Sequence, residues 1–169
     1  MTIKDIDDVY TYSDWANQKL IKVIEALPPE EFTGRVGGSF ESIRNTLVHM
    51  LSAEWGWLAR CGGPERGPKL EHEHFPTLAA IEETWGNVQR GRRELLSSLK
   101  DDDVTRMITY YNDRGETRSL SLGEIMMHAA NHNAHHRGQV SMMLRILGHT
   151  PGNVDQLFYH GERRGVPTW

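Results

Sequence analysis

Histidines crowd into one short stretch of this chain, HAANHNAHHRGQ, which occupies residues 128–139. Four of the nine histidines lie there: His128, His132, His135 and His136. Imidazole nitrogens are common ligands of divalent metals, and two of them one helical turn apart can bind a single ion. The first question is therefore which of these side chains point the same way, and what could complete a site.

A helical pattern divides the four histidines into two pairs. Apolar residues recur at spacings of three and four across residues 121–147, which predicts one long amphipathic helix. His132 and His136 fall inside its apolar stripe, whereas His128 and His135 fall on the margin of that stripe. Residues four apart on a helix have Cβ atoms about 5–6 Å from each other. His132 and His136 are therefore predicted to face the protein interior together.

The inward pair has a structural and a functional interpretation. A single histidine in a core is more often a hydrogen-bonded structural residue than a metal ligand. Two neighbouring imidazoles are different, because burial without partners is costly and two protonated rings would repel each other. A bound divalent cation removes both costs, so the spacing of His132 and His136 favours a metal site.

A pair of ligands is incomplete, and the sequence offers two sources for a third. His49 lies at the edge of the apolar stripe of another predicted helix, in NTLVHMLSAEWGWL, and could lean toward a neighbouring helix. His72 and His74, in KLEHEHFP, lie in a loop and are expected to be mainly solvated. His49 is the favoured third ligand, with the two loop histidines as alternatives.

Glu54 is an unexpected carboxylate, because it falls near the middle of the apolar face of the predicted helix that contains His49. A buried carboxylate must be paired or must serve chemistry. Asn133 and Arg137, on the opposite margin of the histidine helix, are candidate partners. A structural ion pair between helices is the favoured interpretation. A group that supports the metal ligands or handles protons is the alternative.

Periodicity and breakers predict the order of the elements. Long helices are expected over residues 3–27, from 39 or 42 to 60, over 78–99 and over 121–147, with a short fifth helix over 154–160. The candidate N-caps are Ser39 or Ser42 for the second helix and Thr77 for the third, while Ser121 and Glu124 form a capping box for the fourth.

Two short segments before the last long helix have strand character. RMITYY and ETRSLS flank NDRG, a turn sequence, and together they predict a β-hairpin. Long helices with shared apolar faces favour an all-α fold, a four-helix bundle that carries this hairpin. The loop over residues 61–76 could span the bundle, which would permit an up-down-down-up order.

Composition narrows the class of protein. The 169 residues suggest a single domain over 1–169. The net charge is −4 and no long run of one sign occurs, so the charge gives no reason to expect a nucleic-acid or acidic-membrane partner.

Cys61 is the single cysteine, so no intrachain disulfide can form. The two glycines after it suggest an exposed position. The first residues lack the apolar core of a signal peptide, and no stretch is apolar for the roughly 20 residues that span a bilayer. A cytoplasmic protein is expected.

At this point the motifs resemble a known family. NHNAHHRGQ is similar to the hallmark of the DinB-like, or DinB/YfiT, superfamily of metal-dependent bacterial proteins. YSDWANQKLIKVIEALPPEEF, IRNTLVHMLSAEWGWLAR and LGHTPGNVDQLFYH also resemble family segments, so the likeness covers nearly the whole chain. The resemblance implies a four-helix bundle, a homodimer, and a three-histidine metal site formed by His49, His132 and His136.

Three histidines leave coordination positions open, which is typical of a catalytic metal. Related members transfer or isomerise groups with low-molecular-weight thiols, so the resemblance implies a metal-dependent thiol S-transferase acting on an electrophilic small-molecule substrate. A metal-dependent hydrolase with Glu54 as base, and a non-catalytic metal-binding stress-response protein, are the alternatives. Zinc is the favoured divalent metal ion, with nickel, copper or iron as further candidates. Neither a substrate nor a catalytic residue beyond the ligands is identified.

Overall fold

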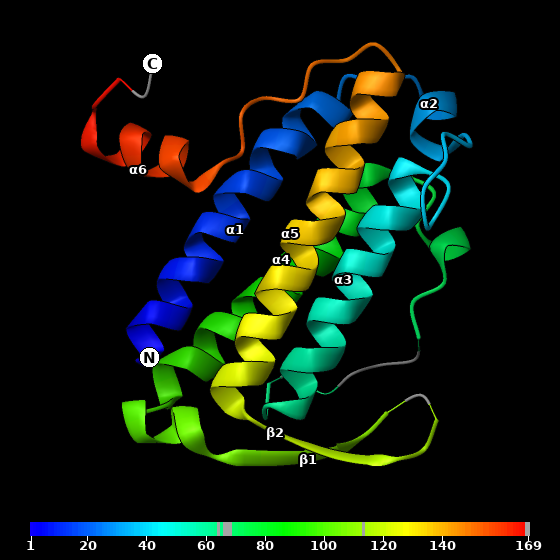
Figure 1. The fold of residues 1–169 in the computed structure, drawn as a ribbon. Coiled ribbons are helices and arrows are strands. Elements are labelled where there is room, and N and C mark those ends of the chain that lie inside the picture. The colour runs from blue at the N-terminus through cyan, green and yellow to red at the C-terminus, as the bar shows by residue number, and fades with distance from the viewer. Residues whose placement is uncertain (64, 66–68, 113, 168–169) are drawn as a thin grey trace.

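The computed structural model of this protein describes residues 1–63, 65, 69–112 and 114–167 (Figure 1). This part of the chain is mostly helical and has one small antiparallel hairpin. The long helices are α1 (Ile3–Ile24), α3 (Ile43–Arg60), α4 (Leu78–Ser98) and α5 (Leu122–Ile146). The shorter elements are α2 (Pro29–Thr33), η1 (His72–His74), η2 (Asp101–Thr105), β1 (Met107–Tyr111), β2 (Thr117–Ser121) and α6 (Gln156–Arg164).

The long helices pack side by side around one apolar core. Helix α5 lies against both α1 and α3, and α4 contacts α1 and α3 from the other side (Figure 1). Helices α1 and α5 run in one direction, and α3 and α4 run in the opposite one. The side chains buried between them include Ile6, Leu51, Ile81, Ile125 and Leu144. Their burial supplies the main favourable term for the packing.

The helix starts follow local capping chemistry, as the sequence predicts. The Ser42 hydroxyl accepts a hydrogen bond from the backbone N–H of Asn45 at 3.1 Å, and Thr77 caps α4 in the same way. Ser121 and Glu124 form the predicted capping box at the start of α5. These side chains satisfy backbone donors that a helix start leaves without partners. Of the two candidate caps for α3, Ser42 is the one used.

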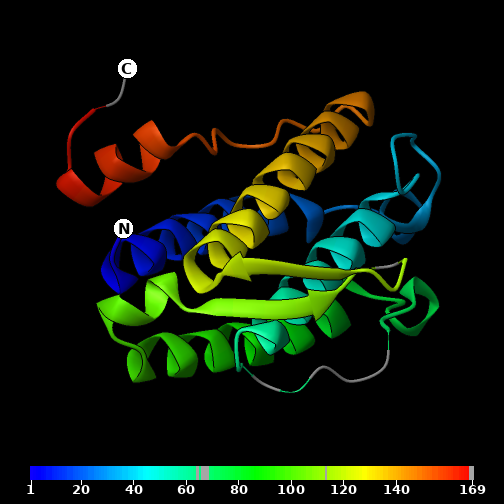
Figure 2. The same ribbon diagram turned by 60° about the horizontal axis from the view of Figure 1, so that its bottom comes forward.

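The predicted hairpin is confirmed, and it lies across the end of the helices where α3 finishes and α5 begins (Figure 2). Strands β1 and β2 pair in antiparallel register, with Met107 opposite Ser121. The Tyr110 ring meets Trp57 at a centroid distance of 5.3 Å, which attaches the hairpin to the end of α3. Asp113, in the predicted turn, lies outside the described residues.

Three details differ from the sequence predictions. Helix α1 ends at Ile24, and Pro29 begins the separate helix α2 because proline suits the first turn of a helix. The last helix runs from Gln156 to Arg164 and ends at Gly165, which adopts the left-handed conformation with φ 63°.

The third difference is Cys61, which is buried rather than exposed. The chain turns back after α3, where the Gly63 N–H donates to the Leu58 carbonyl oxygen at 3.0 Å, and the Cys61 side chain belongs to the apolar core. Burial raises the pKa of that thiol to about 11, so it stays protonated at neutral pH.

None of the helices in the described part of the chain combines the length and the apolar character that crossing a bilayer requires.

Candidate metal centre

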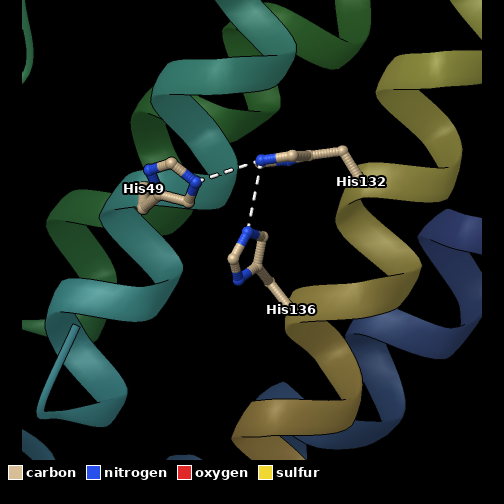
Figure 3. A group of neighbouring side chains, drawn as sticks. All are labelled: His49, His132 and His136. Carbon is tan, nitrogen blue, oxygen red and sulfur yellow. Dashed lines mark hydrogen bonds between the residues drawn. The ribbon is translucent and has the colours of Figure 1, made fainter. Parts of the chain in front are cut away.

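Three imidazoles meet between α3 and α5 (Figure 3). The Nε2 atom of His132 lies 3.1 Å from Nε2 of His49 and 3.2 Å from Nε2 of His136. One potential ligand atom from each residue lies within 4.8 Å of the other two. This histidine cluster (His49, His132 and His136) has the separation expected of side chains that could share one ion.

The helix packing explains why these side chains converge. His132 and His136 are one turn apart on α5, and their ring centroids are separated by 4.4 Å. Helix α3 packs against α4 on one side and α5 on the other, so a residue at the edge of its apolar stripe faces one neighbour. His49 occupies such an edge and points toward α5 (Figure 3).

The other four histidines of the two motifs lie outside this group of potential ligands. His128 and His135 are exposed on α5, as their position on the margin of the stripe predicts. His74 is exposed on η1, and His72 pairs with Glu73 at 2.9 Å. Among the described residues, neither loop histidine belongs to the group of potential ligands.

The cluster cannot satisfy its own hydrogen-bonding groups. Burial, with a smaller effect from His136, lowers the pKa values of His49 and His132 to about 4, so both rings are neutral at pH 7. A neutral imidazole has one N–H donor and one lone pair. Nε2 of His132 faces two other Nε2 atoms, and a single proton cannot serve both contacts as a donor. A divalent cation can accept a lone pair from each ring, so this donor set fits Zn²⁺ and its neighbours.

Gln139 orients one of the potential ligands, and the sequence reading assigned it no role. Nδ1 of His136 donates to Oε1 of Gln139 at 2.9 Å, and Nε2 of Gln139 lies 3.2 Å from Nε2 of His135. A proton on Nδ1 leaves the lone pair of His136 on Nε2, which points at the other two rings. The signal was the spacing, because position 139 lies three residues after His136 on the same helix face.

Phe40 covers the cluster and was also missed as a site residue. Its ring stacks on His49 with a centroid distance of 3.9 Å and an interplanar angle of 22°. It also meets His136 edge-on at 5.4 Å. The loop before α3 folds back through positive φ angles at Gly38 and Glu41, 77° and 67°. The sequence signal was the Gly37–Gly38 pair, which permits such a turn.

A cavity of about 370 Å³ opens beside the cluster. His49 and Phe40 form part of its wall, and we refer to it as the His49 cavity. Val48 and Leu70 line part of the remainder, together with polar side chains that include Asn45, Ser52, Lys69 and His72. Its volume lies within the range of small-molecule sites, which are typically about 300–1,000 Å³.

Glu54 belongs to a different buried cluster. Its Oε2 accepts from Trp85 Nε1 at 2.9 Å and from Asn133 Nδ2 at 2.7 Å, while its Oε1 pairs with Arg92. Arg92 also pairs with Asp14. This Glu54 network joins all four long helices, since its members come from α1, α3, α4 and α5.

The ion pair between helices that the sequence favours for Glu54 is present, with one of the two suggested partners correct. Asn133 binds Glu54, but Arg137 does not. Instead, Nη1 of Arg137 donates to Ser13 Oγ and Asn17 Oδ1 on α1, each at 3.1 Å. The sequence reading missed Arg92 because its polar surroundings, QRGRRE, are typical of a solvated helix face.

Comparison with known proteins agrees with this architecture. The model of the DinB family matches residues 1–165. Protein DinB of Bacillus subtilis (strain 168) is 23% identical over 158 residues, which cover 89% of this chain and 91% of that protein. The crystal structure of a DinB-like protein from Bacillus cereus ATCC 10987 superimposes with a TM-score of 0.73 at 22% identity, covering 91% of this chain and 98% of that one. On the family match over nearly its full length, this chain belongs to the DinB family.

Proposed function

We propose that this protein binds one divalent metal ion through His49, His132 and His136, with zinc as the first candidate and nickel, copper or iron as alternatives. The observation that carries the proposal is the convergence of three imidazole nitrogens that no arrangement of their own protons can satisfy. Gln139 supports it by holding one lone pair in the required direction. We assign the fold as a four-helix bundle in up-down-down-up order and the chain as one domain over residues 1–169.

We further propose that the metal serves a thiol S-transferase reaction on an electrophilic small molecule, the activity that the family resemblance implies. When bound, the metal would lower the pKa of a thiol. The thiol loses its proton, its sulfur forms a bond to the electrophilic carbon, and the leaving group departs with the bonding electron pair and takes up a proton. The His49 cavity offers space for the reactants, and Phe40 excludes water from one side of the ligands.

The structure gives less support to hydrolysis with Glu54 as base. Both carboxylate oxygens of Glu54 are engaged, one by Arg92 and the other by Trp85 and Asn133. A general base must reach the water from which it takes a proton. A carboxylate whose two oxygens already accept these hydrogen bonds is a weaker candidate for a base than one that faces open solvent.

Elemental analysis of untagged protein tests the metal site first. We expect one equivalent of metal in the wild type and none in His136→Ala, whereas His74→Ala, altered at an exposed histidine of η1, retains it. Equal metal content in all three proteins would overturn the proposed ligands.

A turnover assay then distinguishes thiol transfer, hydrolysis and the non-catalytic alternative. Conjugation of 1-chloro-2,4-dinitrobenzene that requires both an added thiol and an intact His132 would support thiol transfer. Release of nitrophenol from a nitrophenyl ester in water alone would indicate hydrolysis. Metal-dependent stabilisation without either turnover would support the non-catalytic stress-response alternative.

A homodimer remains part of the proposal. Met142 and Ile146 are 62% and 64% exposed on α5, where they line a shallow groove with Gly138, Ser141 and Arg145. Exposed methionine and isoleucine side chains on one helix face suit contact with a second copy of the chain. Light scattering should give twice the monomer mass for the wild type and the monomer mass for Met142→Lys/Ile146→Lys. A monomeric wild type would contradict the proposal.

A further inference from the structure

A second cavity is lined by residues of the N-terminal half of α1 and of helix α6. Helix α6 lies beside α1, on the side of the molecule away from α3 (Figure 1). The volume of this cavity is about 390 Å³. Lys4 and Asp8 of α1 line one wall, and Tyr159, His160, Arg163 and Arg164 of α6 line the other. None of these residues belongs to the histidine cluster or the His49 cavity. We refer to this cavity as the α1–α6 groove.

The α1–α6 groove carries surplus positive charge. Lys4 and Asp8 neutralise each other through an ion pair of 2.5 Å. Neither Arg163 nor Arg164 forms an ion pair with a carboxylate within the described part of the chain. The chain as a whole has a net charge of −4, so this concentration of cations runs against the overall balance. Cations without partners in a concave site attract anions.

The wall formed by α6 is held firmly in place. Glu162 accepts hydrogen bonds from Trp15 Nε1 at 2.9 Å and from Lys19 Nζ at 2.6 Å, which attaches α6 to the middle of α1. Tyr159 is buried, and its ring centroid lies 5.5 Å from that of Trp15. The groove is therefore formed before any ligand arrives.

The guanidinium of Arg163 is also positioned in advance. Its Nη1 donates to the hydroxyl oxygen of Tyr159 at 2.9 Å, and its carbon lies 5.4 Å from the centroid of the same ring. Arginine loses less freedom on binding an anion when its fork is already oriented. Basic residues in the last turn of a helix also balance its dipole, but that effect requires neither this ring contact nor a cavity.

We propose that the α1–α6 groove binds a small polyanion bearing phosphate or carboxylate groups, with Arg163 and Arg164 as the principal contacts and His160 as a further donor. Arginine forks match the paired oxygens of both groups and bind them through charge-assisted hydrogen bonds. The volume admits a molecule the size of a nucleotide or an organic tricarboxylate.

Calorimetric titration of the full chain tests the site, with inorganic pyrophosphate and citrate as separate probes. We expect saturable binding of at least one probe at low salt, and the preferred probe tells phosphate from carboxylate recognition. Arg163→Gln/Arg164→Gln should weaken binding at least tenfold. Arg90→Gln/Arg93→Gln removes the same charge from exposed positions on α4 and should leave the affinity within a factor of two.

Because both probes can also chelate a metal, the same titration is repeated with His132→Ala, which should bind as the wild type does. Loss of binding in His132→Ala would assign the signal to the histidine cluster and overturn the groove proposal. Equal weakening in the two double variants would show that binding depends on the net charge of the protein alone, which would overturn the groove proposal. A wild type that binds neither probe would also overturn it, and each of these results leaves the proposed metal function untouched.

Discussion

Two polar clusters lie between the long helices, the Glu54 network and the histidine cluster. They differ in the charges and hydrogen-bonding groups that their members bring together. In the Glu54 network, carboxylates meet a guanidinium, an indole N–H and an amide N–H. In the histidine cluster, three groups of one kind face each other. The first arrangement contains its own counter-charge, whereas the second lacks an electron-pair acceptor.

The comparison teaches that burial of polar groups does not by itself indicate a ligand site. Glu54 is 2% exposed and more deeply buried than His49 or His132, and sequence reading alone gave it a possible catalytic role. In the structure its partners hold it in an ion pair between helices. Nε of Arg92 and Oδ1 of Asn133 lack hydrogen-bond partners, but the carboxylates of the Glu54 network still meet a cation. The histidine cluster becomes a ligand-site candidate because its three ring nitrogens meet with no cationic side chain among them. Four measurements would break or sharpen this distinction.

The largest effect is expected from loading the histidine cluster with metal. A ligand that binds only the folded state at 1,000 times its Kd stabilises it by about 4 kcal/mol. Added zinc should therefore raise the unfolding free energy of the wild type by about 4 kcal/mol at that excess and leave that of His132→Ala unchanged. Urea titrations with and without zinc measure this. His128→Ala, altered at an exposed histidine of the same helix, should respond like the wild type.

The next effect is expected from opening the Glu54 network. Glu54→Gln keeps the shape of the side chain but removes a charge that faces buried Arg92, so we expect a loss of about 3 kcal/mol in unfolding free energy. Glu83→Gln, at an exposed position on α4, should stay within about 0.5 kcal/mol of the wild type. Unchanged stability together with lost metal binding in Glu54→Gln would instead place Glu54 in the metal site.

Acid should destabilise the metal-free protein through the histidine cluster. Folding lowers the pKa values of His49 and His132 from an ordinary 6.5 to about 4, so the unfolded chain takes up protons first as the pH falls. The stability contributed by these neutral rings is present above about pH 6.5 and is lost progressively toward pH 4. The loss is smaller than the full shifts suggest, because both side chains are only partly buried.

Urea midpoints at pH 7.5, 5.5 and 4.5 measure this loss in chelator-treated protein. His49→Gln/His132→Gln cannot gain these protons, so its stability should fall less steeply between pH 6.5 and 4 than that of the wild type. Parallel pH profiles would mean that other groups control the acid response.

The smallest effect is expected at Gln139. Gln139→Leu removes the acceptor for Nδ1 of His136 and should weaken zinc binding about tenfold, or about 1.4 kcal/mol, without unfolding the protein. Gln139→Glu restores an acceptor and should recover most of the affinity. Competition with a zinc-binding dye measures both values, and equal affinities for wild type and Gln139→Leu would show that the hydrogen bond does not matter.

Features that depend on neighbours in the chain were predictable from the sequence. The spacing of His132 and His136 selected the inward pair, because both rings lie on the face of α5 that the helical period defines. The caps at Ser42, Thr77 and Ser121 were predictable for the same reason, since each bonds a backbone N–H three residues away. His49 was only partly predictable, because a position at the edge of a stripe can turn toward either neighbouring helix.

The amino-acid sequence by itself thus determined the long helices, the caps at three of their starts, the hairpin and the direction of two of the three imidazoles. Tertiary structure decided that His49 faces α5, that Phe40 folds back over it, and that Arg92 rather than Arg137 meets Glu54. The physical reason is the distance along the chain over which each interaction acts. Helix period and capping act over three or four residues, whereas the partner of a buried charge depends on which faces of distant helices come together.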